Sequence, residues 1–263
     1  MLENALLYPR RDGGWRTILI GGILSFFGFL ILPIFLLHGY TVRLLRSAAL
    51  DVDEPPQFND WGELFVDGLK AFAINIVYIF VPYVLVLISV GLTVLVGEAV
   101  FGGGAAVAGL SILVGLVAMV FLLVVACTLP VALTNFAVED RLGAAFEVKK
   151  IISAVFTREY GIAVLLSIGV GVIVVVAFTI VGLIIQLIFI AAILGATGGA
   201  GGDPTMGLGA SFIGIIGFMV MIGAILIGIF VGFYIHMVVY YLLGQGCGPS
   251  LVSTPQIESS TSE

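Results

Sequence analysis

Residues 105–138 read AAVAGLSILVGLVAMVFLLVVACTLPVALTNFAV and contain no charged side chain. A helix of this length exceeds the ~20 apolar residues that are needed to cross the hydrocarbon core of a bilayer. The sequence therefore predicts an all-α, polytopic integral membrane bundle with about five hydrophobic segments. The other segments are three long runs at about 71–97, 160–194 and 207–243, and a shorter run at 17–37.

The composition agrees with a membrane protein. The chain is 61% hydrophobic with a mean hydropathy of +1.26, whereas soluble domains are about 45–50% apolar. We expect one membrane domain over residues 17–243, after a polar lead at 1–16 and before a tail at 244–263, whose Gly, Ser, Thr, Pro and Glu content predicts disorder. The net charge of −6 argues against a nucleic-acid partner, because phosphates would be repelled. The lipid bilayer is the expected surrounding partner.

Positive charge is confined to three short stretches of the chain. Membrane proteins hold Lys and Arg mainly on the cytoplasmic side, so we expect a multi-pass protein of the cell membrane with residues 38–70 and 139–158 in the cytoplasm. The Gly-rich turns at 97–104 and 195–207 carry no basic residue and are expected on the opposite side. The ten basic residues are Arg10, Arg11, Arg16, Arg43, Arg46, Lys70, Arg141, Lys149, Lys150 and Arg158.

The first hydrophobic run leaves two topologies open. Residues 17–37 are long enough to cross the membrane, and five crossings would place residues 1–16 and 38–70 on opposite sides. If the run instead bends near Pro33 and returns as a re-entrant hairpin, all ten basic residues share one side. Run length favours the first topology and the charge distribution favours the second. We prefer five crossings.

Two polar segments, 58–70 and 139–158, carry apolar side chains at helical spacing. An apolar stripe opposite charged residues is typical of a short amphipathic helix that lies in the membrane interface. The alternative is that each segment is a solvated extension of the adjoining span. The two stripes comprise Phe58, Trp61, Phe65, Leu69 and Phe72 in the first, and Leu142, Ala145, Phe146, Ile152, Val155 and Phe156 in the second.

Polar side chains inside the long runs are few. None of these runs has Asp, Glu, Lys or Arg in its middle, which argues against ion-coupled transport, since such transporters place ionisable groups inside the membrane. The remaining candidates for a polar pocket lining are Asn75, Asn135 and Gln186. Each of these residue types also commonly hydrogen-bonds a neighbouring helix.

Small residues in the last run, Ala224, Gly228 and Gly232, recur every four positions, which predicts close helix packing. The sequence holds no glycine-rich nucleotide loop, no Ser-His-carboxylate set and no metal-ligand spacing around its two histidines. We therefore expect no enzymatic activity, no cofactor and no metal site.

Three stretches carry a family resemblance: Tyr8-Pro9-Arg10 through Trp15, His38–Arg43 and Asp60–Lys70. Together they resemble DUF4013, a family of prokaryotic, often archaeal, polytopic membrane proteins. The resemblance covers about residues 4–245 and implies an integral membrane protein, but it carries no activity or catalytic residue to transfer. Its most specific positions, which we treat as a candidate interfacial motif with simple membrane anchoring as the alternative, are Gly39, Tyr40, Arg43, Trp61, Phe65, Gly68 and Lys70.

Two functions are compatible with these features. The first is a non-enzymatic membrane scaffold or accessory subunit, which works with a membrane-protein partner or as a homo-oligomer. The alternative is a channel or transporter for an uncharged or lipid-like solute, lined by Asn75, Asn135 and Gln186.

Overall fold

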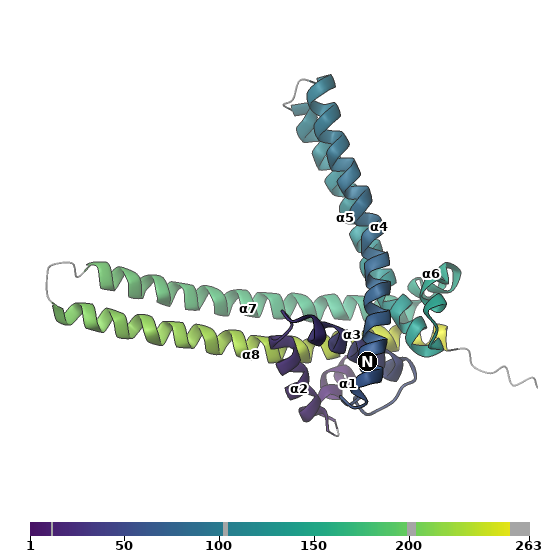
Figure 1. Cartoon of the computed structure of the whole chain (residues 1–263), viewed down its shortest axis with the longest axis horizontal. Coiled ribbons are helices and arrows are strands. Elements are labelled where there is room, and N and C mark those ends of the chain that lie inside the picture. Colours follow the sequence, from purple (N-terminus) through teal and green to yellow (C-terminus); the bar gives the residue numbers. More distant parts are fainter. Residues whose placement is uncertain (12, 102–104, 199–203, 253–263) are drawn as a thin grey trace, which may run out of the picture.

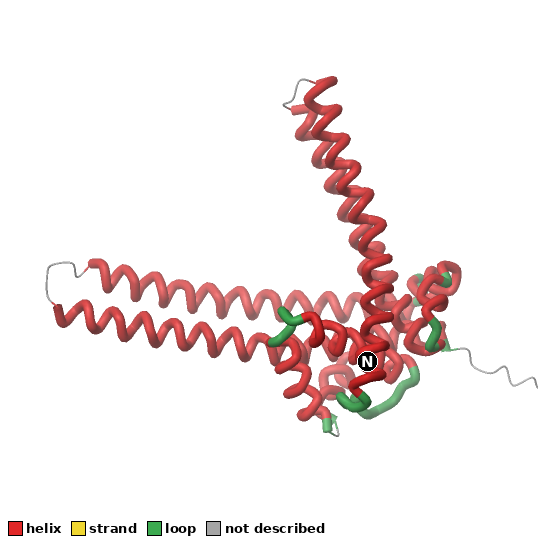
Figure 2. Tube along the Cα trace, viewed as in Figure 1, coloured by secondary structure: helices red, strands yellow, loops and turns green. Residues whose placement is uncertain are grey.

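The computed structural model describes residues 1–11, 13–101, 105–198 and 204–252. All regular structure in these residues is helical (Figure 2). Two long antiparallel hairpins dominate the molecule and diverge from a common base (Figure 1). They are formed by α4 (Trp61–Phe101) with α5 (Ala105–Glu139), and by α7 (Arg158–Gly198) with α8 (Pro204–Leu251).

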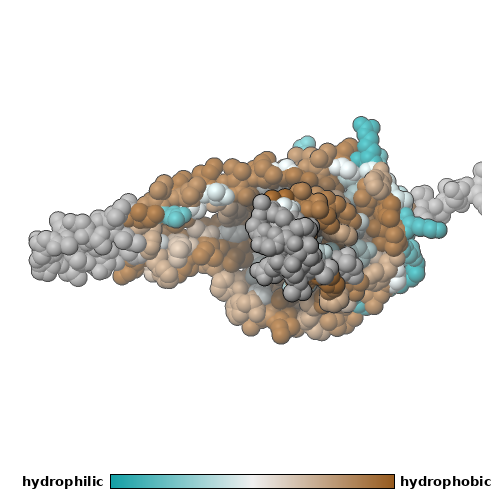
Figure 3. Space-filling view, turned by 90° about the horizontal axis from the view of Figure 1, so that it is seen from above, coloured by the Kyte–Doolittle hydropathy of each residue, from teal (hydrophilic) through white to brown (hydrophobic). Residues whose placement is uncertain are grey.

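Four described helices are long and apolar enough to cross a membrane, which confirms an all-α, polytopic membrane fold. The apolar windows of α5, α7 and α8 have no residue buried within the chain. In Figure 3 the described part of the α7–α8 hairpin is mostly hydrophobic, whereas most of the hydrophilic residues in view gather at the base. The candidate spans are Trp61–Gly91, Ser111–Glu139, Arg158–Ile190 and Ile215–Leu251.

The run at 17–37 is not the single long helix that the preferred five-crossing topology expects, because it is divided between two helices. α2 (Gly14–Phe26) has 13 residues and is about 20 Å long, which is too short to cross. The chain turns at residues 27–30, and Pro33 lies in the first turn of α3 (Ile31–Ala49), where a missing N–H costs nothing. The bend therefore precedes Pro33.

Both ends of this α2–α3 hairpin lie at the base. Arg11, just before α2, forms a 2.7 Å ion pair with Asp53, just after α3. Thr17 of α2 donates a hydrogen bond to the carbonyl of Pro56 at 3.4 Å. The turn itself exposes apolar side chains, with Phe29 76% exposed. This is the geometry of the re-entrant alternative, in which an apolar tip enters the bilayer and both ends stay on one side.

The base is the part of the described chain where side chains are most extensively buried. α3 lies at its centre and packs against α2, α4, α5 and α8. The short N-terminal helices α1 (Leu2–Leu7) and η1 (Tyr8–Arg10) close one side against α8. The fully buried large side chains there include Tyr8, Tyr40, Leu44, Leu45, Leu64, Phe136, Tyr160, Met237 and Tyr241.

The two amphipathic segments have different structures. Residues 61–70 are the first turns of α4, which continues without a break, so 58–70 follows the alternative of an extension of the span. Residues 139–158 instead form two short helices, η2 (Leu142–Phe146) and α6 (Val148–Val155). Their apolar stripe is split: Ala145 is buried, whereas Phe156 is 84% exposed.

The expected tail at 244–263 begins too early, because α8 continues to Leu251 and only 253–263 lie outside the described residues. The glycines that suggested disorder are contact points instead. A Cβ atom on Gly248 would lie 2.7 Å from the carbonyl oxygen of Ala49 in α3, and one on Gly246 would lie 2.6 Å from the Cβ of Ala163 in α7. The absence of side chains allows α8 to approach two helices at once.

Candidate functional site

The crossing of α3 and α4 is the closest backbone approach among the resemblance residues. A Cβ atom on Gly39 of α3 would lie 2.8 Å from the carbonyl carbon of Leu64, and one on Gly68 of α4 would lie 2.6 Å from that of Phe35. A side chain at either position would therefore overlap the partner backbone. The two helices can be this close only because both positions are glycine.

Aromatic residues of the same motif pack beside this crossing. Tyr40 is fully buried and stacks on Phe58 with 4.5 Å between ring centroids, and Phe58 stacks in turn on Trp61 at 5.9 Å. Phe65 packs edge-on against Phe35 at 5.4 Å. Trp61 is 47% exposed, whereas Tyr40 belongs to the core.

Arg43 connects α3 to the start of α4. Its guanidinium donates to the backbone carbonyl of Asn59 at 2.8 Å and to the side-chain oxygen of Asn59 at 2.7 Å, and it lies 3.3 Å from a carboxylate oxygen of Glu63. The planar guanidinium of an arginine can make these contacts with Asn59 and Glu63 at once, which a lysine ammonium could not do with the same geometry. Arg43 therefore holds the loop at 51–60 against the two helices that cross at Gly39 and Gly68.

Charged side chains extend this junction to α5. Asp140, the residue after α5, lies 3.6 Å from Arg46 of α3 and 3.9 Å from Lys70 of α4. Lys70 also lies 3.5 Å from the buried carboxylate of Asp67 and above the ring of Phe136. A buried carboxylate without a cation would be costly, so Lys70 has a structural role here.

A second set of ion pairs reaches α6. Glu139 accepts from Lys150 of α6 at 2.5 Å and from Arg141 at 2.6 Å, and Arg141 also pairs with Glu147. These contacts fix the short helices to the end of α5. We call the whole set the charged platform: Arg43, Arg46, Asp67, Lys70, Glu139, Asp140, Arg141 and Lys150.

The N-terminal segment is attached to the same base through Tyr8. Its ring stacks on Tyr241 of α8 with 3.9 Å between centroids, and its hydroxyl donates to the carbonyl of Glu54 at 2.9 Å. Burial raises the pKa of the Tyr8 hydroxyl above its ordinary value, so this donor stays protonated at physiological pH.

The three polar candidates lie in separate places. Asn75 borders a groove beside His38 and donates to the carbonyl of Ala71 in its own helix. Asn135 is fully buried and donates to the carbonyl of Ala144 in η2 at 2.7 Å. Gln186 lines a groove between α7 and α8. They do not line a common pocket among the described residues.

The predicted packing stripe on α8 is divided in the same way. Ala224 and Gly228 face α7, where a Cβ on Gly228 would lie 3.1 Å from the ring of Phe178. Gly232 borders a different groove, toward α2 and α3, and its Cβ would meet no atom within 4 Å. The tighter contacts on α8 involve residues that the spacing did not indicate. They are Phe230 and Phe233 against Gly22 and Gly21 of α2, and Gly244, Gly246 and Gly248 near the helix end.

A polar contact also crosses the α3–α8 interface. The hydroxyl of Thr41 lies 3.0 Å from Nε2 of His236. Sequence inspection did not pair these residues, which are far apart in the chain. The only available signal was that both are polar and lie at the base ends of apolar helices.

These features define a multi-pass helical membrane protein with its charged groups gathered at one end. The model of the family described as "Protein of unknown function (DUF4013)" matches residues 23–183, which contain α3, α4, α5 and α6 and the whole charged platform. The chain belongs to this family. No curated protein and no solved structure matches it.

Proposed function

We propose that the protein is a non-enzymatic scaffold or accessory subunit of the cell membrane. The observation that carries the proposal is the contrast between base and hairpins. In the base, ion pairs and close helix contacts at glycines hold the helices together. The apolar windows of α5, α7 and α8, in contrast, are not buried by the rest of the chain. Apolar helix flanks of this length suit contact with lipid and with the spans of another membrane protein.

The proposed orientation has the charged platform in the cytoplasm. Ion pairs place Arg11, Arg46 and Lys150 at the base, and both hairpin tips point away from it (Figure 1). Because the Lys and Arg residues of membrane proteins are retained on the cytoplasmic side, the platform and the N-terminus would share that side. The two Gly-rich turns would then face outward.

Cysteine labelling tests this orientation. In a chain with Cys127 and Cys247 replaced by Ala, we expect Glu3→Cys and Glu54→Cys to be protected from a membrane-impermeant maleimide in intact cells. We expect Ala200→Cys to be labelled. Labelling at positions 3 and 200 but not at 54 would instead restore five crossings. Labelling at 3 and 54 but not at 200 would invert the proposed orientation.

Site-specific photocrosslinking tests the scaffold role. A photoreactive residue at Ile173 of α7 or Leu122 of α5, which are 69% and 62% exposed, should yield one stoichiometric adduct with a different membrane protein in native membranes. The same residue at Phe156, exposed but on the base, measures collisional background. If both hairpins yield only lipid adducts or only adducts with a second copy of this chain, the accessory role fails.

The alternative function is movement of an uncharged or lipid-like solute. The supporting observation is the apolar groove of about 450 Å³ between α7 and α8, which holds Gln186. Flux through vesicles that contain the purified protein and that stops in a Gln186→Leu variant would favour this function over the scaffold. Gln186 would then act alone, since Asn75 and Asn135 lie elsewhere.

A further inference from the structure

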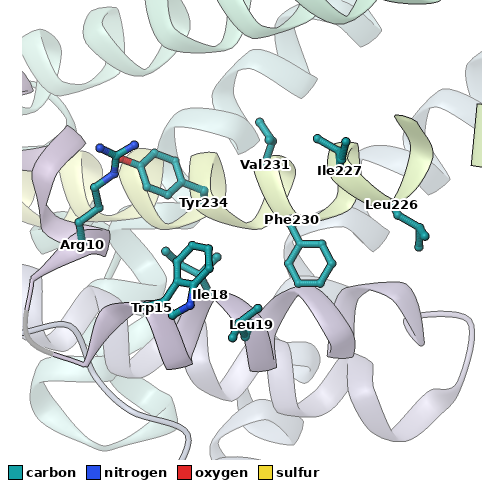
Figure 4. Close-up of a pocket in the computed structure, with 9 residues that line it drawn as sticks. All are labelled: Arg10, Trp15, Ile18, Leu19, Leu226, Ile227, Phe230, Val231 and Tyr234. Atoms are coloured by element: carbon teal, nitrogen blue, oxygen red, sulfur yellow. The ribbon is translucent and has the colours of Figure 1, made fainter. Parts of the chain in front are cut away.

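A long apolar groove runs between α2 and α8 on the outside of the base (Figure 4). Its volume is about 530 Å³. Leu19 of α2 and Leu226 and Phe230 of α8 are among its lining residues, and the polar end is formed by Arg10, Trp15 and Tyr234. Tyr234 and Leu226 are eight positions apart, so the groove extends about 12 Å along α8 from the polar end.

The polar end carries the positive charge of Arg10. The guanidinium of Arg10 lies 5.9 Å from the ring centroid of Tyr234, whose hydroxyl donates to the carbonyl of Leu6. This contact orients Arg10 without neutralising it. No carboxylate pairs with Arg10 in the part of the chain that the structure describes, and Arg16 in the first turn of α2 is likewise exposed and without an ion pair there.

In its lack of a carboxylate partner among the described residues, Arg10 differs from the cations that stabilise the base. The side chains of Arg11, Arg43, Arg46, Lys70, Arg141 and Lys150 all pair with carboxylates. Their charge is therefore largely compensated within the protein. A cation at the end of an apolar groove, held by an aromatic ring and with no carboxylate partner among the described residues, is complementary to a ligand with one negative group and a hydrocarbon chain.

We propose that this groove binds one anionic phospholipid of the leaflet that contacts the base. The phosphodiester lies at Arg10, with Arg16 adding charge, and the upper part of one acyl chain follows the groove past Leu19 and Phe230. Trp15 is 67% exposed and has an indole N–H suited to the headgroup boundary.

The dimensions of α2 agree with a lipid of one leaflet. α2 is about 20 Å long and ends in the exposed Phe26, whereas half of the hydrocarbon core is about 15 Å thick. α2 therefore reaches into the bilayer from the base without crossing it. The groove between α2 and α8 is aligned with the acyl chains of the same leaflet, and its cation lies at headgroup level.

The position of the two tryptophans allows a direct test. Trp15 lines the groove, whereas Trp61 packs on Phe58 at the start of α4. A Trp61→Phe variant therefore reports on the groove through Trp15 fluorescence. It is reconstituted in phosphatidylcholine vesicles that contain a minor fraction of phosphatidylglycerol or phosphatidylcholine with brominated acyl chains, since bromine quenches tryptophan on contact.

We expect brominated phosphatidylglycerol to quench Trp15 at a lower mole fraction than brominated phosphatidylcholine. Arg10→Gln should reduce this headgroup preference about fivefold, the effect of losing one cation beside an anionic membrane surface. Arg10→Lys should retain most of it. The matched control is Arg158→Gln, which removes another exposed cation, one that does not line the groove, and should leave the preference unchanged.

Four results would overturn the proposal. Equal quenching by the two brominated lipids would show ordinary annular lipid contact. A preference that survives Arg10→Gln would place the headgroup elsewhere. Absence of quenching by either lipid, in a protein that elutes as the parent does, would mean that a second copy of the chain covers the groove. Competition by inorganic phosphate would also count against it, because the site would then recognise a free anion and not a lipid.

Discussion

Replacing Gly39 or Gly68 by alanine should destabilise the protein by about 3 kcal/mol or more, at the upper end of the range for overpacked sites. The added methyl group would lie 2.8 Å from the carbonyl carbon of Leu64 in the first variant and 2.6 Å from that of Phe35 in the second. Backbone atoms cannot move aside as a flexible side chain can. The only relief is separation of α3 from α4, which would also disturb the contacts of Arg43 and Lys70.

The measurement is the thermal midpoint of the purified protein in mild detergent, together with its elution profile. Two other glycines of α4, Gly62 and Gly91, provide matched controls, because a Cβ atom on either would meet no atom within 4 Å. Gly91→Ala should be neutral or stabilising by up to about 1 kcal/mol, through better helix propensity. Equal midpoints for Gly39→Ala and Gly91→Ala would contradict the close crossing of α3 and α4.

The long spans were predictable because length and apolarity are sufficient to define them. The run at 105–138 corresponds to α5 at Ala105–Glu139. The run at 17–37 was misjudged for a physical reason. The turn that divides it, at residues 27–30, is itself apolar in sequence, so the hydropathy does not drop where the chain reverses. The charge distribution contained the better signal.

The residues of the site were only partly accessible from sequence. Family resemblance, and not chemistry, indicated Gly39, Gly68 and Arg43, and the structure shows a helix crossing where an interfacial motif was expected. Phe58 and Asp140 complete the junction. The sequence placed Phe58 only in an amphipathic stripe and did not distinguish Asp140, whose partners Arg46 and Lys70 come from other helices. Asn75, Asn135 and Gln186, which were selected because they are polar, lie on three different helices.

Composition was least informative at the end of the chain. Gly244, Gly246 and Gly248 were interpreted as a disordered tail, although glycine serves equally in disorder and in close helix contact. The four-residue spacing of Gly244 and Gly248 puts both on the side of α8 that faces α3, and Gly246 faces α7. Spacing was the feature that could have distinguished the two roles.

Truncation after Leu243 should therefore be severely destabilising. It removes the buried side chains of Cys247 and Leu251, and with them the contacts of α8 with Ala49 and Ala163. Burial of one large apolar side chain contributes about 1.5–3 kcal/mol, so the loss should reach about 3–5 kcal/mol. It should also release the hydrogen bond from Gln245 to Asp51, which connects α8 to the loop after α3.

The control is truncation after Val252, which removes residues 253–263 and keeps every contact described above. Its thermal midpoint should match that of the full chain. A point variant separates side-chain burial from loss of the helix end: Leu251→Ala should cost about 2–5 kcal/mol by leaving a cavity in the core. If truncation after Leu243 and after Val252 gave the same midpoint, the end of α8 would contribute nothing to the base. The original expectation of a tail from residue 244 would then stand.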